Sequence, residues 1–153
     1  MITKDNVLSV QKLWGDAIVE IGSLKNDRKK CEKVTEELIE KLYDFNRKEV
    51  LFKPTRAVEI PFRPTLEAAM SYFIGGNENY PEDKGFALQP SWTRIRFENA
   101  GMILEENRAI AMGNYFLTDF NGDEIKVEYT FGYTKTEDGL KIDLHHSSLP
   151  YSP

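Results

Sequence analysis

The C-terminal end of the sequence carries the highest density of groups that could do chemistry. It reads Asp143-Leu144-His145-His146-Ser147-Ser148-Leu149-Pro150, so hydroxyl and imidazole side chains occupy half of these eight positions. Successive side chains of a strand point to opposite faces, which places His145 and Ser147 together. The other face takes the remaining residues, which are Ile142, Leu144, His146 and Ser148. The alternation does not say which of the two faces lines a cavity.

Ligands for a transition metal are scarce in this chain. Cys31 is the only cysteine, and the two histidines are adjacent, so they cannot bind one ion together in regular strand geometry. A catalytic zinc ion usually takes three protein ligands, and no H-x-E, C-x-x-C or H-E-x-x-H pattern occurs. The sequence therefore predicts no metal and no cofactor. The single cysteine also excludes an intramolecular disulfide.

Further polar side chains interrupt apolar segments. Thr55 follows a proline, and Tyr72 lies shortly before Gly75-Gly76. Either residue could line a cavity, or Thr55 could form part of a turn and Tyr72 could pack in the core. The same two interpretations apply to polar residues on the expected strands, which are Arg94, Arg96, Asn114 and Tyr115. No G-x-S-x-G elbow or glycine-rich phosphate loop is present, which argues against a serine hydrolase or a nucleotide-binding protein.

Helical periodicity dominates the first half of the chain. Apolar residues recur every three or four positions over residues 5–24, with Thr3 or Asp5 as N-cap, and again over residues 27–49. The second segment carries balanced charges that are typical of a solvated helix face. Three prolines then indicate a strand and a loop over residues 50–64. A compact third helix follows from residue 66 and ends at Gly75-Gly76, and residues 77–85 form a loop.

From residue 91 the pattern alternates with a period of two. It predicts strands over residues 93–97, 108–118, 124–134 and 140–148, with turns at 99–101, 106–107, 121–123 and 138–139. Connections this short require antiparallel neighbours. Gly113 and Gly132 lie inside otherwise good strands, where each would permit a bend or a bulge.

Helices followed by an antiparallel meander indicate an α+β fold. We predict one domain over residues 1–153, with the N-terminal helices packed on a curved antiparallel sheet as a nuclear-transport-factor-like cone around a cavity. The alternative is a plain helix-on-sheet sandwich with a filled core. With 41% hydrophobic, 12% aromatic and 29% charged residues, the composition is that of an ordinary globular protein.

Charge and the first residues indicate which partners to expect. The formal net charge is −5, from 25 acidic and 20 basic side chains, which offers no basic footprint for nucleic acid. The N-terminus leads directly into an amphipathic pattern, without a basic leader or a long apolar run. We therefore expect no nucleic acid, no membrane association and a cytoplasmic location.

Six blocks of the sequence resemble the iota class of carbonic anhydrases, and together they span nearly the whole chain. They are Lys53-Pro54-Thr55, Ser71-Tyr72-Phe73, Glu82-Asp83-Lys84-Gly85-Phe86, Ala111-Met112-Gly113-Asn114-Tyr115, Val127-Glu128-Tyr129-Thr130-Phe131-Gly132-Tyr133 and His145-His146-Ser147-Ser148-Leu149-Pro150. The last block is the most specific, and it is also similar to the last strand of the calmodulin-dependent-kinase association domain. The resemblance implies reversible hydration of carbon dioxide to bicarbonate by a homodimer, without a metal in the cyanobacterial and algal branch.

The resemblance also implies a substrate site. Its residues would be Thr55, Tyr72 and Ser147, and we add His145 as the nearest group able to accept or relay a proton near neutral pH. Two other functions remain open on this fold. One is a non-catalytic ligand-binding or oligomerisation module of the association-domain type. The other is an isomerase or dehydratase that would use Asp143 or His146 as its base.

Overall fold

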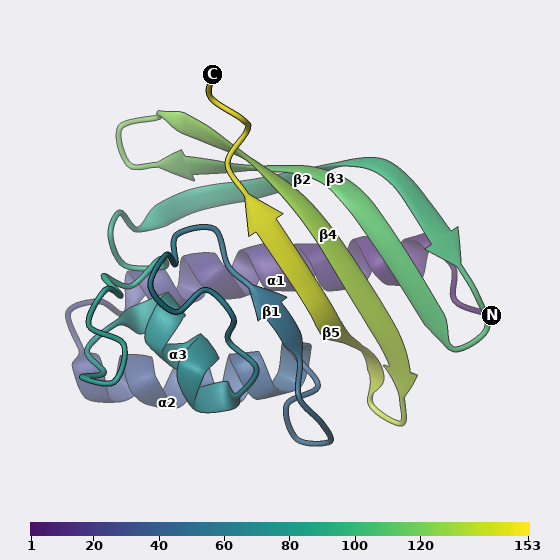
Figure 1. The fold of residues 1–153 in the computed structure, drawn as a ribbon, viewed down its shortest axis with the longest axis horizontal. Helices are drawn as coiled ribbons and strands as arrows, with labels where there is room; N and C mark the ends of the chain where they lie inside the picture. The colour runs from purple at the N-terminus through teal and green to yellow at the C-terminus, as the bar shows by residue number, and fades with distance from the viewer.

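A computed structural model describes residues 1–153 as three helices on one face and edge of a five-stranded sheet (Figure 1). The helices are α1 (Lys4–Ser23), α2 (Arg28–Leu42) and α3 (Leu66–Ile74). The strands are β1 (Leu51–Lys53), β2 (Trp92–Leu104), β3 (Arg108–Asp119), β4 (Glu124–Thr136) and β5 (Gly139–Ser148). In Figure 1, α1 crosses behind the sheet, while α2 and α3 lie beside its β1 edge. The predicted α+β arrangement is confirmed.

The sheet has the strand order β1-β5-β4-β3-β2. The four long strands pair antiparallel in sequence order, as their short connections predict. The short strand β1 pairs parallel with β5, so that Phe52 lies opposite His145 and Lys53 lies opposite His146. This pairing brings the segment that precedes Thr55 beside the C-terminal motif.

A bulge replaces the turn that was predicted at residues 99–101. β2 continues through this region, and its register against β3 shifts between Asn99 and Gly101. Gly113 lies opposite the bulge, and a Cβ atom there would come within 2.2 Å of the Glu98 carbonyl oxygen. The glycine is therefore required by the close approach of the two backbones, and the predicted turn is wrong because Gly101 belongs to a bulge.

A second bulge changes which residues of β5 face the core. The register between β4 and β5 shifts between Gly132 and Tyr133, and Asp143 is the additional residue. Ile142 is consequently buried on the same side as His145 and Ser147, whereas His146 is exposed. Strict alternation had placed Ile142 with His146, and this part of the prediction is wrong because the bulge resets the period.

The helices begin and end at recognisable caps. Thr3 caps α1, with its side chain accepting from the backbone N–H of Asn6 while the Asn6 side chain accepts from Thr3 N–H. The helix predicted over residues 27–49 ends earlier, at Leu42. It ends there because Tyr43 adopts an extended conformation and forms a bridge with Ile142 of β5.

The core lies between the sheet and the three helices and is rich in aromatic rings. Trp14 of α1 packs against Phe97, Tyr115 and Phe131 of the sheet. Tyr43 stacks on Phe52 of β1. These rings exclude water from the inner face of β5, where His145 and Ser147 are buried.

A buried guanidinium group ties together the irregular segments around α3. Arg63 is completely buried and binds Asp83 with two hydrogen bonds of 2.8 Å. It also donates to the carbonyl oxygens of Ile60 and Ala68, at 2.7 and 2.9 Å. The Ser71 hydroxyl donates to Asp83 at 2.5 Å. One ion pair thus joins the loop after β1, helix α3 and the loop that follows it.

We predict that Arg63→Met destabilises the fold by about 3–5 kcal/mol, because the Asp83 carboxylate would stay buried without its partner. Urea denaturation followed by circular dichroism measures the change. Arg96→Met is the matched control, since Arg96 pairs with Glu98 and Glu124 on the exposed face of β2 and should have a much smaller effect. Equal losses in the two variants would contradict the role assigned to Arg63.

Candidate functional site

Hydroxyl groups from two distant segments meet at the end of β5. Thr55 lies just after β1, and its Oγ1 is 2.9 Å from Oγ of Ser147 on β5. The parallel pairing of β1 with β5 brings them together, and Lys53 Nζ donates to the Ser147 carbonyl oxygen at 3.0 Å. Ser147 is 1% exposed, so its hydroxyl is removed from bulk water.

Two tyrosines complete this cluster. Tyr72 of α3 accepts a hydrogen bond of 3.2 Å from the backbone N–H of Arg56, which leaves its own hydrogen free to donate. Burial raises the pKa of Tyr72 well above 10. Burial also raises the pKa of Tyr115 to about 12, against a smaller lowering by the Ser147 and Thr55 hydroxyls. Both phenols are therefore protonated donors at neutral pH.

The hydroxyl cluster borders a tightly packed hollow that leaves no room for a water-sized sphere in this conformation. Its lining consists of Trp14, Phe52, Pro54, Thr55, Tyr72, Phe73, Phe86, Tyr115, His145 and Ser147. The walls are thus mainly aromatic, with polar atoms supplied by hydroxyl and imidazole groups. These polar atoms suit a small molecule that accepts hydrogen bonds.

His145 lies inside an aromatic enclosure. Its ring stacks on Phe52 and Tyr43, with centroids 4.9 and 6.0 Å away, and lies 4.1 Å from Phe131. Nδ1 is 2.7 Å from the Tyr43 hydroxyl, and Nε2 is 3.4 Å from the Tyr115 hydroxyl. Both ring nitrogens are therefore occupied by tyrosine partners.

The role of proton acceptor expected for His145 does not agree with these surroundings. Burial is the larger cause and the charge of His146 the smaller cause of a pKa of His145 that lies well below 6.5. A neutral ring whose protonation is this unfavourable is a poor acceptor at pH 7. Its contacts instead make it a hydrogen-bonding partner of the tyrosine hydroxyls.

The remaining groups of the C-terminal motif lie away from the hollow. His146 is exposed and Ser148 is partly exposed on the opposite face of β5. Asp143 accepts from Lys48 Nζ at 3.0 Å and from Arg108 at 2.7 Å. Burial raises the pKa of Asp143, but the hydrogen bonds and charges of these two partners lower it by more. The net shift of the pKa is therefore downward. Neither Asp143 nor His146 lines the hollow as a base for an isomerase or dehydratase.

Side chains that could bind a metal do not cluster anywhere in the structure. No group of three or more His, Cys, Asp and Glu residues is arranged to hold an ion. Cys31 is buried in α2, where its thiol contacts the Ile21 carbonyl oxygen and the Thr35 hydroxyl.

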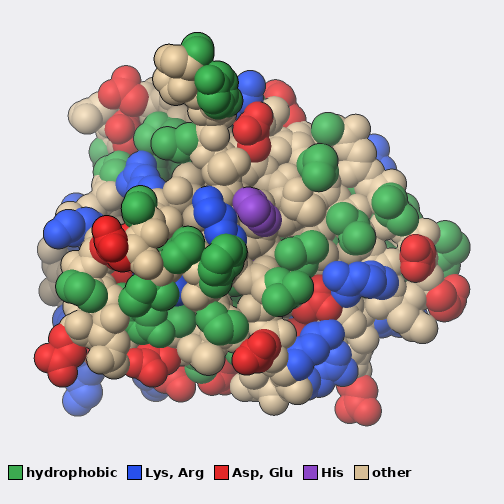
Figure 2. Space-filling model, in the orientation of Figure 1, with side chains coloured by type: hydrophobic (Ala, Val, Ile, Leu, Met, Phe, Trp, Pro, Cys, Tyr) green, Lys and Arg blue, Asp and Glu red, His purple; other side chains and the backbone are tan.

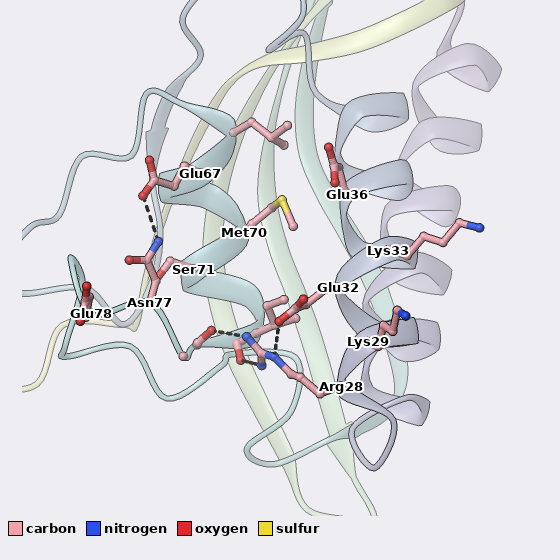
Figure 3. Close-up of a pocket in the computed structure, with 14 residues that line it drawn as sticks. Arg28, Lys29, Glu32, Lys33, Glu36, Glu67, Met70, Ser71, Asn77 and Glu78 are labelled. Carbon is pink, nitrogen blue, oxygen red and sulfur yellow. Dashed lines mark hydrogen bonds and ion pairs between the residues drawn. The ribbon is translucent and has the colours of Figure 1, made fainter.

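A wider groove separates α2 from α3 and has a different character (Figure 3). It measures about 870 Å³ and is open to solvent. Arg28 spans its lower end and binds Glu32 and the carbonyl oxygens of Ile74 and Gly75. Because none of the predicted site residues lines it, we do not assign the activity to this groove.

The sequence assigns no definite role in the site to three residues. Trp14 belongs to an apolar helix stripe, Tyr43 lies inside a helix that is predicted to continue, and Tyr115 could line a pocket or face water. All three are aromatic residues that carry a polar atom. Such an atom usually has a hydrogen-bond partner when the ring is buried, and this is the one feature of the sequence that could have indicated their role.

The three helices packed on the curved antiparallel sheet define a nuclear-transport-factor-like cone. Similar solved structures include an NTF-2-like protein of unknown function from Shewanella oneidensis MR-1, with a TM-score of 0.56, 14% identity and coverage of 96% of this chain and 99% of that chain. A protein from Xanthomonas campestris described as a putative calcium/calmodulin-dependent protein kinase II association domain matches with a TM-score of 0.59, 22% identity and coverage of 95% and 87%. At these identities the likeness establishes the fold, and it confirms the predicted cone.

Closer matches show that the chain belongs to the metal-independent carbonic anhydrases, whose family model matches residues 5–149. A metal-independent carbonic anhydrase from Nostoc sp. strain PCC 7120 is 40% identical over 154 residues, covering 98% of this chain and 75% of the relative. The crystal structure of a cyanobacterial iota-carbonic anhydrase complexed with bicarbonate matches with a TM-score of 0.95 at 38% identity, over 99% of this chain and 94% of that chain. The resemblance seen in the sequence and the enzyme class are confirmed.

None of the three helices combines the length and the apolar character needed to cross a membrane.

We predict that the His145 ring stays neutral from pH 8 to pH 6 in the folded protein. In the unfolded chain the ring would protonate near its ordinary pKa of 6.5. The unfolded state then binds more protons, so the free energy of unfolding should fall below pH 6.5 by up to about 1.4 kcal/mol per pH unit. An NMR titration of the imidazole signals, made in His146→Gln so that one histidine remains, measures the protonation. A midpoint near 6.5 in the folded protein would contradict the prediction.

Proposed function

We propose that this chain hydrates carbon dioxide reversibly to bicarbonate in the hollow lined by Thr55, Tyr72 and Ser147. The observation that carries the proposal is the convergence of these three hydroxyls, which come from a loop, a helix and a strand, on one small buried space. Bicarbonate is an anion with three oxygen atoms that accept hydrogen bonds, and carbon dioxide is small and apolar. The hollow offers both kinds of surface.

In the proposed reaction, the oxygen of a water molecule attacks the carbon of carbon dioxide. One C–O bond forms, the carbonyl π-electron pair moves onto a substrate oxygen, and the water gives up one proton. Hydroxyl donors aimed at that oxygen stabilise the developing charge, and removal of one such donor typically costs about 3–4 kcal/mol of barrier. Thr55, Tyr72 and Ser147 would supply these donors.

The proton must leave the hollow, because the groups that line it are neutral at pH 7. A second pocket shares Tyr72 and Phe86 with the hollow, and its other polar lining residues are Arg56, Lys84, Gln89, Glu82 and Asp83. We propose that water in this pocket accepts the proton and passes it to buffer.

We predict that Ser147→Ala lowers kcat/KM for carbon dioxide hydration by roughly a hundredfold, because one donor to the developing charge is lost. Stopped-flow measurement of proton release gives the rate. Ser148→Ala is the matched control, since Ser148 belongs to the same strand but does not line the hollow, and it should keep wild-type activity.

The same assay tests the absence of a metal requirement when it is repeated after exhaustive chelation. Activity should survive. Loss of activity that zinc or manganese restores would contradict the metal-free mechanism, and wild-type activity in Ser147→Ala would remove Ser147 from it.

We further propose that the protein acts as a cytoplasmic homodimer that pairs through the outer face of its sheet. Figure 2 shows this face, where hydrophobic side chains are spread among tan atoms around a histidine. One row across the sheet brings together apolar residues of four strands, which are Leu51, Leu144, Ile110 and Ile103. The next row contains Met112, which is 57% exposed. A second copy of the chain would cover these side chains.

We predict that Met112→Glu weakens the dimer by at least tenfold in dissociation constant, because it would bury a charge at the interface. Sedimentation equilibrium measures the constant. Leu13→Glu is the control, since Leu13 is 48% exposed on α1, away from the outer face, and should leave the dimer intact. A wild-type protein that sediments as a monomer would contradict the proposal.

A further inference from the structure

A chain of buried hydrogen bonds leads from α1 to the hollow. Trp14 Nε1 donates to the Tyr43 hydroxyl at 2.9 Å, and this hydroxyl lies 2.7 Å from Nδ1 of His145. On the other side of the imidazole, Nε2 lies 3.4 Å from the Tyr115 hydroxyl. Tyr115 lines the hollow together with Ser147. Tyr43 does not line the hollow and is connected to it through His145 and Tyr115, whereas Trp14 lines the hollow and also donates to Tyr43.

Trp14 determines the direction of this chain. An indole N–H can only donate, so the Tyr43 oxygen accepts from it. The Tyr43 hydroxyl has one other partner, Nδ1 of His145, which must therefore receive the Tyr43 hydrogen. A neutral imidazole carries one hydrogen, and it is left on Nε2. This N–H faces the Tyr115 oxygen and leaves the Tyr115 hydrogen to point toward the hollow.

We propose that Trp14 and Tyr43 are positioning residues that hold His145 in the Nε2–H tautomer and thereby orient the hydroxyl hydrogens toward the substrate. The inference rests on the proposed function and adds to it a reason why the hollow presents donors. Hydrogens fixed in this direction need not reorient when negative charge develops on the substrate, which is the condition for strong electrostatic stabilisation.

The opposite tautomer would have two costs. With hydrogen on Nδ1, the Tyr43 oxygen would receive two hydrogens, and its own hydrogen would have no acceptor in a fully buried position. The free lone pair on Nε2 would also attract the Tyr115 hydrogen away from the hollow. Donation to bicarbonate would then compete with donation to His145.

The experiment compares the wild-type protein with Tyr43→Phe. Long-range ¹H–¹⁵N correlation spectra distinguish the two tautomers of a neutral imidazole, and the chain has only two histidines to assign. Tyr133→Phe is the matched control, because it also removes a hydroxyl from a fully buried tyrosine that accepts a hydrogen bond, here from Gln11 at 3.3 Å. Tyr133 does not line the hollow.

We expect the Nε2–H tautomer in the wild-type protein and in Tyr133→Phe, and a mixture of tautomers in Tyr43→Phe. We expect kcat/KM for carbon dioxide hydration to fall about tenfold in Tyr43→Phe, less than the hundredfold or more for a lost direct donor, because Tyr43 acts through His145. Tyr133→Phe should keep wild-type kinetics.

A wild-type His145 that carries its hydrogen on Nδ1 would overturn the inference, even if Tyr43→Phe does not fold. Unchanged tautomer and rate in Tyr43→Phe, or an equal loss in Tyr133→Phe, would also overturn it. A wild-type protein without carbon dioxide hydration would instead overturn the proposed function, while the tautomer would still decide the direction of the chain.

Discussion

The buried ion pair between Arg63 and Asp83 is the constraint on which the site depends. Thr55 lies in a loop and Tyr72 on a helix of only nine residues, and neither segment belongs to the sheet that carries Ser147. Arg63 fixes both segments because it binds carbonyl oxygens in the loop and at the start of α3, and Asp83 adds the Ser71 hydroxyl. Burying both charges of such an ion pair costs desolvation free energy. Removing one partner destabilises the fold more, because the other charge then stays buried without compensation. The ion pair therefore holds the loop and α3 together, while the parallel pairing of β1 with β5 places Thr55 beside Ser147.

The hydroxyl cluster consists of neutral hydrogen-bond donors inside an aromatic shell, which avoids the free-energy cost of burying charged groups. Ionised groups in the hollow would have to be desolvated, whereas hydroxyls can be satisfied by one another, as Thr55 and Ser147 are. The surrounding rings lower the local dielectric, which strengthens each hydrogen bond to a substrate that acquires charge. The cost is that no group in the hollow serves as a strong base. Proton removal is therefore assigned to water in the adjoining pocket.

Much of the fold could be predicted from the sequence because it follows local periodicity. The α1 stripe, the glycine end of α3 and the antiparallel meander each depend on neighbouring residues. The bulges expected at Gly113 and Gly132 are confirmed. The errors arose where tertiary contacts decide: the turn expected at residues 99–101, the face assigned to Ile142, and the end of α2, where Tyr43 bridges to β5. For the same reason the resemblance could supply Thr55, Tyr72 and Ser147, while the partners of His145 could not be predicted. They are aromatic residues whose polar atoms matter only once folding has buried them together.

Reversibility gives the neutral hollow a further advantage. Carbon dioxide carries no charge and bicarbonate carries one, so a cation inside the hollow would bind the product far more strongly than the substrate. Such differential binding would slow bicarbonate release, even though a cation would also stabilise the charge that develops in the transition state. The ionised residues nearest the hollow line the adjoining pocket instead, and they are Arg56, Lys84, Glu82 and Asp83. Hydroxyl donors inside the hollow can thus stabilise the transition state without holding bicarbonate as tightly as a buried cation would.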